Sequence, residues 1–252
     1  MVAAAGPLSS GPRDPWLTNA GLPVTAFFTD RTGGTGVAPY DTFNLASHVG
    51  DAPKAVTANH AILRELAGTP FTLMDPVHGA AVAVITEPGA KAPQADILVT
   101  RTPGVALVTL AADCVPVLLH DAVTGAVAAA HIGREGLFDG AVDNAVAAIA
   151  DVRGNWGELD KVTAVIGPAI CGRCYEVPPL MREQVASRHA SAFATTKWGT
   201  PSVDMPRAIE TRMSELGVTV VRIARCTFED PDLFSHRMDG VTGRQAGVIV
   251  CA

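Results

Sequence analysis

The pattern of hydrophobic and polar positions predicts alternating strands and helices after residue 20. Short runs of Val, Ile, Leu and Ala that end at Gly, Pro, Asp or Asn are typical of strands. They lie at residues 23–29, 81–86, 105–112, 115–120, 126–131, 161–167, 218–224 and 246–251. Apolar positions spaced three and four residues apart predict helices. These lie at residues 53–67, 140–151, 179–189 and 205–216.

Two helix boundaries carry end signals. Asp51 is a candidate N-cap for the helix at 53–67, and Gly68 ends that helix. Asp204 occupies the cap position of the helix at 205–216.

The strands are scattered along the whole chain, without an internal repeat, a low-complexity linker or a charge block. This favours one α+β domain over residues 21–252, with mixed β-sheets flanked by helices in layers. Residues 1–20, rich in Gly, Pro and Ser, are expected to form a flexible tail.

Composition narrows the possible partners. The 252 residues are 48% hydrophobic, with 19 basic and 25 acidic side chains and a net charge of −6. The chain lacks the Lys/Arg stripe of a nucleic-acid-binding surface, and its aromatic content of 5% is too low for base stacking. Its apolar runs stay below the roughly 18 residues of a membrane span. We therefore expect a small-molecule partner, with neither nucleic acid nor membrane.

The N-terminus and the cysteines favour the cytoplasm. The first apolar residues precede Arg13, whereas a secretory signal has its charge first. An odd number of cysteines, five, in a chain of this length argues against a disulfide framework. The sequence carries no signal for the oligomeric state.

Three segments place a metal-capable side chain at a strand end beside Gly or Asp. They contain His78, Cys114 and His131. If the turn-rich residues 121–125 form a hairpin centred between Ala122 and Val123, Cys114 and His131 pair directly. Opposite side chains of such a ladder have Cβ atoms about 4.5–5.5 Å apart, which suits two ligands of one ion.

The pair by itself also fits a nucleophilic Cys–His dyad. Adding His78 gives three protein ligands, as in catalytic zinc sites, or the His₂Cys set of a blue-copper centre. A multicopper oxidase needs many more imidazoles than the seven histidines available, so zinc is favoured over copper.

Two further segments are candidates for anion binding, and one motif is set aside. Arg31 beside Gly33 and Gly34 could hold an anion through its guanidinium and backbone N–H groups. The basic run at 235–244 offers similar groups. Cys171 and Cys174 form a C-x-x-C without a second such motif, which we interpret as coincidence.

Taken together, the segments resemble the laccase-domain proteins, also called multicopper polyphenol oxidases, purine nucleoside phosphorylases or peptidoglycan editing factors. The matching blocks are residues 28–34, 43–51, 77–79, 112–116, 131–133, 167–177, 226–237 and 242–247. The resemblance implies zinc at His78, Cys114 and His131, and mixed sheets flanked by helices. It implies substrate or phosphate binding by Arg31, Asn44, His48 and Arg134, and catalytic roles for Asp113, Cys114 and Arg31.

The implied activity is phosphorolysis of adenosine, inosine and methylthioadenosine, with adenosine deamination alongside. The alternatives are a Cys114–His131 or metal-dependent hydrolase of mis-built peptidoglycan precursors, a copper polyphenol oxidase, which we disfavour, and a non-enzymatic metal-binding protein.

The chain departs from the family pattern at four positions. Pro76 stands where the family has Gln, Arg134 and Glu135 stand where it has Trp and Arg, and Glu229 stands where many members have Cys. These changes leave the three ligands intact and put substrate preference in doubt.

Overall fold

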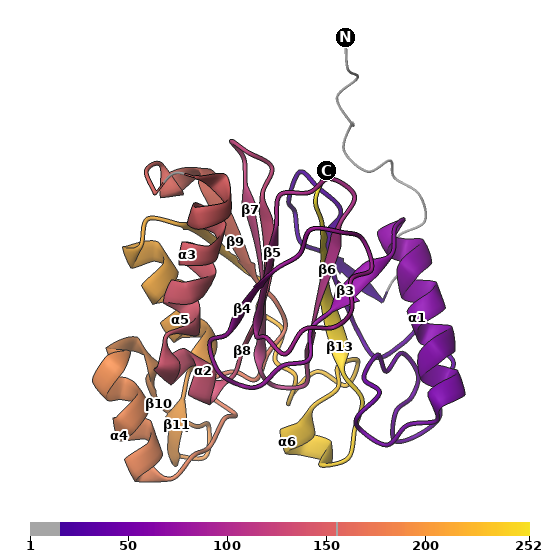
Figure 1. Ribbon diagram of the computed structural model, residues 1–252. Coiled ribbons are helices and arrows are strands. Elements are labelled where there is room, and N and C mark those ends of the chain that lie inside the picture. Colours follow the sequence, from indigo (N-terminus) through magenta and orange to yellow (C-terminus); the bar gives the residue numbers. More distant parts are fainter. Residues whose placement is uncertain (1–15, 155) are drawn as a thin grey trace.

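Two β-sheets lie face to face in the centre of the molecule, and helices cover both outer faces (Figure 1). The computed structural model describes residues 16–154 and 156–252. The order of layers is helix, sheet, sheet, helix, which confirms the predicted α+β class with mixed sheets flanked by helices.

The first sheet is built from both ends of the chain. Within the described residues its strands are, in spatial order, β1 (Leu17–Asn19), β2 (Ala26–Thr29), β13 (Gln245–Val250), β6 (Ala106–Ala111) and β3 (Phe71–Leu73). β3 runs parallel to β6, and the other pairs are antiparallel.

The second sheet comes from the middle of the chain. Among the residues described, its order is β12 (Thr219–Arg222), β9 (Val162–Ile166), β7 (Val115–Asp121), β8 (Val127–Ile132), β5 (Ile97–Thr100) and β4 (Val82–Val84). Each edge strand is parallel to its neighbour, β12 to β9 and β4 to β5, while the central pairs are antiparallel. A separate hairpin joins β10 (Phe193–Thr195) to β11 (Pro201–Val203).

Helices cover the outer face of each sheet (Figure 1). α1 (Pro53–Ala67) packs on the first sheet. The helices on the side of the second sheet are α2 (Arg134–Asp139), α3 (Ala141–Arg153), α4 (Pro179–Arg188) and α5 (Met205–Glu215). The short helix α6 (His236–Asp239) lies near the lower end of the sheets, and two 3₁₀ turns span Leu159–Lys161 and Ala190–Ala192.

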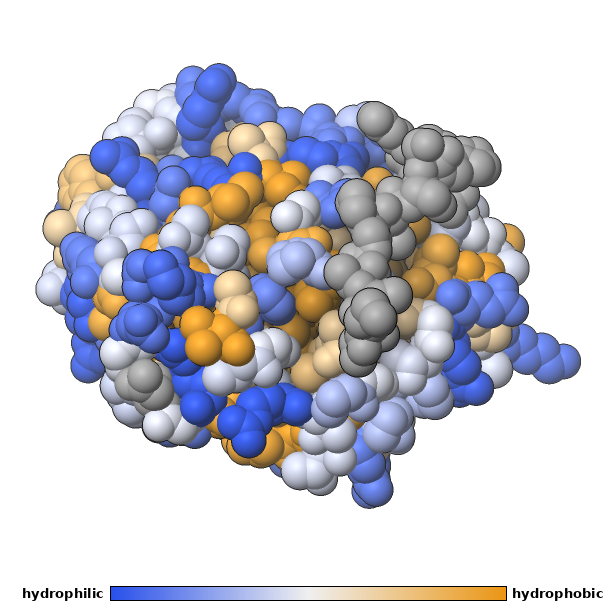
Figure 2. Space-filling view, turned by 90° about the horizontal axis from the view of Figure 1, so that it is seen from above, coloured by the Kyte–Doolittle hydropathy of each residue, from blue (hydrophilic) through white to orange (hydrophobic). Residues whose placement is uncertain are grey.

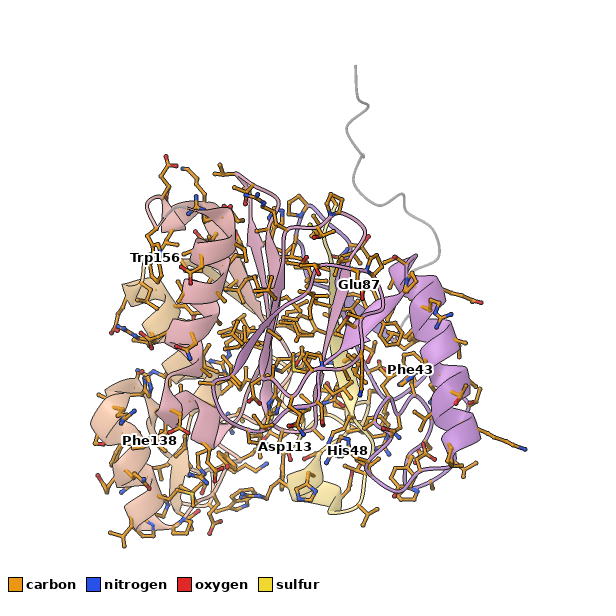
Figure 3. All side chains as sticks on the ribbon, in the orientation of Figure 1. Phe43, His48, Glu87, Asp113, Phe138 and Trp156 are labelled. Atoms are coloured by element: carbon orange, nitrogen blue, oxygen red, sulfur yellow. The ribbon has the colours of Figure 1, made fainter. Side chains whose placement is uncertain are left out.

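The central strands read as continuous apolar runs because both of their faces are buried. Along β7, Val117 and Leu119 face the helices, while Leu118 between them faces the other sheet. Leu118 there joins an inter-sheet core that includes Phe28 and Leu107. Figure 3 shows side chains filling the space between the sheets.

Most sequence-predicted elements are confirmed, and two local predictions are wrong. The helix at 53–67 has the predicted bounds and ends at Gly68 with φ 71°. Asp51 is not its N-cap, because Ala52 holds that position and Asp51 accepts from the Ala52 N–H (2.7 Å). The tail predicted over residues 1–20 is too long, since β1 pairs with β2; residues 1–15 lie outside the described residues.

Labelled side chains mark the two ends of the sheets. Asp113 and His48 lie at the lower end, while Glu87 and Trp156 lie at the upper end (Figure 3). The upper face shows hydrophobic residues in its middle, bordered by hydrophilic ones (Figure 2). Across 16–154 and 156–252, every helix is too short or too polar to span a bilayer.

Replacing Leu118 with alanine tests the inter-sheet core. Leu118 is fully buried, so Leu118→Ala should lower the free energy of unfolding by about 2–5 kcal/mol through lost contacts and a cavity. Urea denaturation followed by circular dichroism measures this. Leu180→Ala is the matched control, because Leu180 is 84% exposed and its loss should cost less than about 0.5 kcal/mol. Equal effects of the two changes would contradict the packing described.

Candidate metal centre

The hairpin of β7 and β8 carries two of the three predicted ligands, with a register that differs from the prediction. Cys114 lies directly before β7, and His131 lies near the end of β8. Pro116, not Cys114, pairs with His131. The predicted direct pairing of Cys114 with His131 is therefore wrong by two residues.

The turn between the strands causes this shift. The Asp121 N–H donates to the Ala126 carbonyl (2.9 Å), and the Gly125 N–H donates back to the Asp121 carbonyl (2.9 Å). Gly125 adopts φ 74°, which favours glycine. Since the shift is an even number of residues, Cys114 and His131 keep the same face and become diagonal neighbours.

The third predicted ligand, His78, lies in the loop between β3 and β4 and is held by Asp96. The Asp96 carboxylate accepts from the backbone N–H groups of His78 and Gly79, each at 2.9 Å. These bonds support His78 at φ 60°, a conformation that is rare outside glycine. Asp96 also contacts Nδ1 of His131 (3.1 Å).

This contact fixes which nitrogen of His131 is available to a metal. With Nδ1 directed at Asp96, Nε2 is left for the ion, the arrangement common among metal-ligating histidines. Asp96 was missed in the sequence, because the strand that directly follows it, residues 97–100, was not predicted.

The donor atoms of the three predicted ligands converge. The side chains of His78, Cys114 and His131 each offer one donor, and the donors lie within 4.8 Å of one another. The two imidazole rings are nearly perpendicular, with centroids 4.8 Å apart. A Cβ on Gly133 would lie 3.1 Å from the Cys114 sulfur, so glycine keeps room beside the cluster. Two nitrogens and a thiolate fit zinc, and the same set is compatible with copper.

The cluster favours a thiolate. Burial would raise the pKa of Cys114, but His131 and His78 outweigh it and lower that pKa to about 6. Burial would lower the pKa of His131, but Cys114 and Asp96 raise it to about 9. Without a metal, the pair is therefore a thiolate beside an imidazolium around neutral pH.

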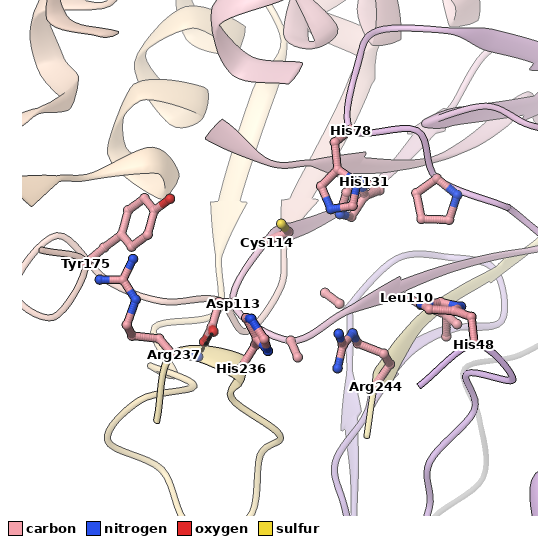
Figure 4. A pocket seen from close by; sticks show the side chains of 13 residues that line it. His48, His78, Leu110, Asp113, Cys114, His131, Tyr175, His236, Arg237 and Arg244 are labelled. Atoms are coloured by element: carbon pink, nitrogen blue, oxygen red, sulfur yellow. Dashed lines mark hydrogen bonds between the residues drawn. The ribbon is translucent and has the colours of Figure 1, made fainter. Parts of the chain in front are cut away.

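The cluster opens into a cavity of about 320 Å³ at the lower end of the sheets (Figure 4). The residues that line it beyond the three ligands are His48, Pro76, Leu110, Ala111, Ala112, Asp113, Tyr175, His236, Arg237 and Arg244. Two arginines and two further histidines thus share one cavity with the predicted metal ligands.

Arg244 and His48 approach the cavity from the same side (Figure 4). Burial lowers the pKa of Arg244, and the negative charges of Cys114 and Asp113 oppose that effect. Burial and the Arg244 charge lower the pKa of His48, which favours the neutral imidazole. Arg244, Arg237 and His236 belong to the basic run that the sequence singled out, without saying which of its members face the site.

Asp113 lies at the floor of the cavity, and its backbone adopts φ 91°. Its carboxylate accepts from the hydroxyls of Thr227 and Ser235, both at 2.7 Å, and from the backbone N–H of Arg237 (2.6 Å). These bonds tie the start of β7 to the segment that carries Arg237.

Three predicted substrate-binding residues, Arg31, Asn44 and Arg134, are not among the residues that line the cavity. The Arg31 guanidinium contacts Asp41 (3.3 Å) and Asp239 (3.9 Å), and it lies over the Phe234 ring. Asn44 is fully buried, and its side-chain oxygen accepts from the backbone N–H of Arg244 (3.0 Å). Asn44 therefore positions Arg244.

Of the positions that depart from the family pattern, Pro76 and Arg134 lie closest to the cavity. Pro76 lines it. Arg134 pairs with the exposed Glu135 (2.7 Å). Burial raises the pKa of Tyr175, and the positive charge of Arg134 partly opposes that rise. Arg134 thus lies beside Tyr175, which lines the cavity.

Comparison with known sequences decides the family. The model of a family described as multi-copper polyphenol oxidoreductase laccase matches residues 25–252. The chain belongs to this family. It is 45% identical over 228 residues to a purine nucleoside phosphorylase of Streptomyces coelicolor, covering 88% of this chain and 93% of that protein. Over 232 residues, covering 90% and 93%, it is 34% identical to one of Escherichia coli.

Solved structures agree with this laccase-family assignment. A Neisseria meningitidis protein matches with a TM-score of 0.80 at 32% identity, covering 90% of this chain and 94% of that one. YlmD from Geobacillus stearothermophilus matches with a TM-score of 0.81 at 29% identity, covering 90% and 91%.

Removing the Asp96 charge tests its support of the ligands. Asp96→Asn should weaken zinc binding by about 10–100-fold, because the orientation and basicity of His131 depend on that carboxylate. Competition with a chromogenic chelator measures the affinity. Asp160→Asn is the control, since Asp160 pairs with the exposed Lys161; equal losses in both variants would contradict the role of Asp96.

The metal-free protein should show a reactive thiolate. Because the Cys114 pKa is about 6, its alkylation rate should rise through pH 6 and level off near neutrality, where the thiolate predominates. Cys251 is the internal reference, because burial raises its pKa. Peptide mapping after iodoacetamide pulses follows each cysteine. A midpoint near the ordinary thiol value of about 8.5 would contradict the ion pair.

Proposed function

We propose that this chain is a zinc-dependent purine nucleoside phosphorylase acting on adenosine, inosine and methylthioadenosine, with adenosine deaminase activity at the same site. The proposal rests mainly on one observation: a His₂Cys cluster shares a single cavity with Arg244, Arg237 and His48. The names of the bacterial relatives support the phosphorolytic activity.

His78, Cys114 and His131 would hold the zinc ion, leaving a position open for substrate. Bound zinc would supply a Lewis acid and lower the pKa of water to about 7, which serves both phosphorolysis and deamination. Copper is disfavoured because the seven histidines of the chain are too few for a multicopper oxidase. Two of them do not line the cavity: His60 and His189 contact the carbonyls of Leu45 (2.8 Å) and Leu137 (3.0 Å).

The cationic side chains would bind phosphate. Arg244 faces the cavity, and Arg237 stacks over the Tyr175 ring with its centre 4.8 Å from the ring centroid. A guanidinium matches the geometry of phosphate oxygens. We assign anion binding to Arg244 and Arg237, with the neutral His48 imidazole as a hydrogen-bond donor, and give Arg31 a supporting role through Asp239 on α6.

Tyr175 and Arg134 offer a place for the nucleoside. Tyr175 presents an aromatic ring to the cavity (Figure 4). A cavity of about 320 Å³ falls in the range of roughly 300–1,000 Å³ that small-molecule sites occupy. Asp113 would act as a positioning residue, because its oxygens already accept three hydrogen bonds.

One observation favours a second candidate. The metal-free pair of Cys114 thiolate and His131 imidazolium matches a cysteine hydrolase. Such an enzyme could edit mis-built peptidoglycan precursors. It would be active without zinc, and Cys114 would be the nucleophile.

Activity and metal content measured on the same variants test the proposal. Zinc-loaded protein should release adenine from adenosine with phosphate, and ammonia without it. Cys114→Ser should lose both the zinc of this site and the activity. Arg244→Ala should lower kcat/KM for phosphate by about 10²–10³-fold, through loss of a charged donor.

Arg64→Ala serves as the control, because Arg64 is exposed on α1. The absence of both base and ammonia release from zinc-loaded protein would refute the proposal. Hydrolase activity of metal-free protein that is lost on Cys114 alkylation would establish the second candidate.

A further inference from the structure

A second group of ligand-type side chains lies behind the cavity wall. Cys171 and Cys174 follow β9, and Cys226 and Glu229 follow β12, its parallel neighbour. Their donor atoms lie within 4.8 Å of one another. The interpretation of Cys171 and Cys174 as coincidental overlooked Cys226 and Glu229, which complete the group from a distant part of the sequence.

The two segments have the same local geometry. The N–H groups of Cys174 and Tyr175 donate to the Cys171 carbonyl, at 2.9 and 3.0 Å. The N–H groups of Glu229 and Asp230 donate in the same way to the Cys226 carbonyl, at 3.1 and 2.9 Å. Each turn therefore directs its first and fourth side chains to a common point.

The turns are fixed against each other by the backbone. Ala169 and Cys226 form a parallel bridge, in which the Ala169 N–H donates to Arg225 and the Thr227 N–H donates to Ala169, both at 3.2 Å. The Cys171 N–H donates to the Cys226 sulfur (3.4 Å). The group is thus preorganised by protein contacts.

We propose that Cys171, Cys174, Cys226 and Glu229 bind a structural zinc ion, distinct from the ion of the cavity. Zinc binds thiolates at about 2.3 Å and carboxylate oxygens at about 2.0–2.2 Å, so its ligands lie within about 4 Å of one another. The observed spacing needs only small adjustments. Four protein ligands close the coordination shell, which is the mark of a structural site.

Neighbouring cations offset the charge of this ligand set. Three thiolates and one carboxylate around Zn²⁺ leave two negative charges. Lys197 contacts Oε1 of Glu229 (2.9 Å), which leaves Oε2 for the ion. Arg173 also acts on Glu229 electrostatically.

The zinc ion would fasten two cavity segments together. Tyr175, which lines the cavity, directly follows Cys174. Thr227, which donates to Asp113, directly follows Cys226. The site would thereby hold the wall and the floor of the cavity in register from behind.

Elemental analysis of the full chain, purified under reducing conditions and supplied with zinc, tests this assignment. The wild type should hold about two zinc ions and Cys174→Ser about one, since a closed site loses its ion with a ligand. Glu229→Ala should bind the second ion more weakly, and Glu229→Cys should restore tight binding. The melting temperature should fall with the loss of zinc in Cys174→Ser.

Two controls separate this site from the cavity cluster. Cys114→Ser should lose only the zinc ion of the cavity. It should keep the ion bound by Cys171, Cys174, Cys226 and Glu229, which a thiol-blocking mercurial should then release. Cys251→Ser should keep both, because the Cys251 sulfur contacts only the Gly125 carbonyl among the polar partners described for it (3.4 Å).

One zinc ion in the wild type that is unaffected by both Cys174→Ser and Glu229→Ala would overturn the proposal. A disulfide between Cys171 and Cys226 in the reduced, zinc-supplied protein, seen by mass spectrometry, would also overturn it.

Discussion

The Asp96 carboxylate is the contact on which the cavity cluster depends. One oxygen reaches both the His78 N–H and Nδ1 of His131, and the other accepts from Gly79. A single buried group thus fixes a strained loop and the orientation of a ring on a different strand. Three donors compensate its buried negative charge, and that charge helps to raise the pKa of His131.

Buried polar side chains also connect the other segments around the cavity. Asp113 joins the start of β7 to the segments that carry Thr227, Ser235 and Arg237. Asn44 joins the N-terminal loop to Arg244. Residues far apart in the sequence therefore line one cavity, because a buried polar group on another element holds the backbone of Arg237 and of Arg244. Buried polar groups of this kind must be satisfied, so they specify the arrangement as well as stabilise it.

Local sequence was sufficient wherever one short segment decides the structure. The helix at 53–67 followed from its spacing and from Gly68, and Asp204 caps α5 by accepting from the Arg207 N–H. Residues 97–100 were missed as a strand, because four buried residues carry too little periodicity to distinguish strand from helix. The hairpin register failed because the hydrogen bonds of Asp121 and Gly125 set the turn centre.

The sequence by itself determined the α+β class, the chemical identity of His78, Cys114 and His131, and the presence of basic residues near the C-terminus. Its patterns report which side chains are buried or reactive, since those properties are local. Only the tertiary structure decided that Arg244 and Arg237 face the cavity while Arg31 does not. It alone brought Cys226 and Glu229 to Cys171 and Cys174, because the pairing of β9 with β12 is a long-range contact that spacing along the chain does not encode.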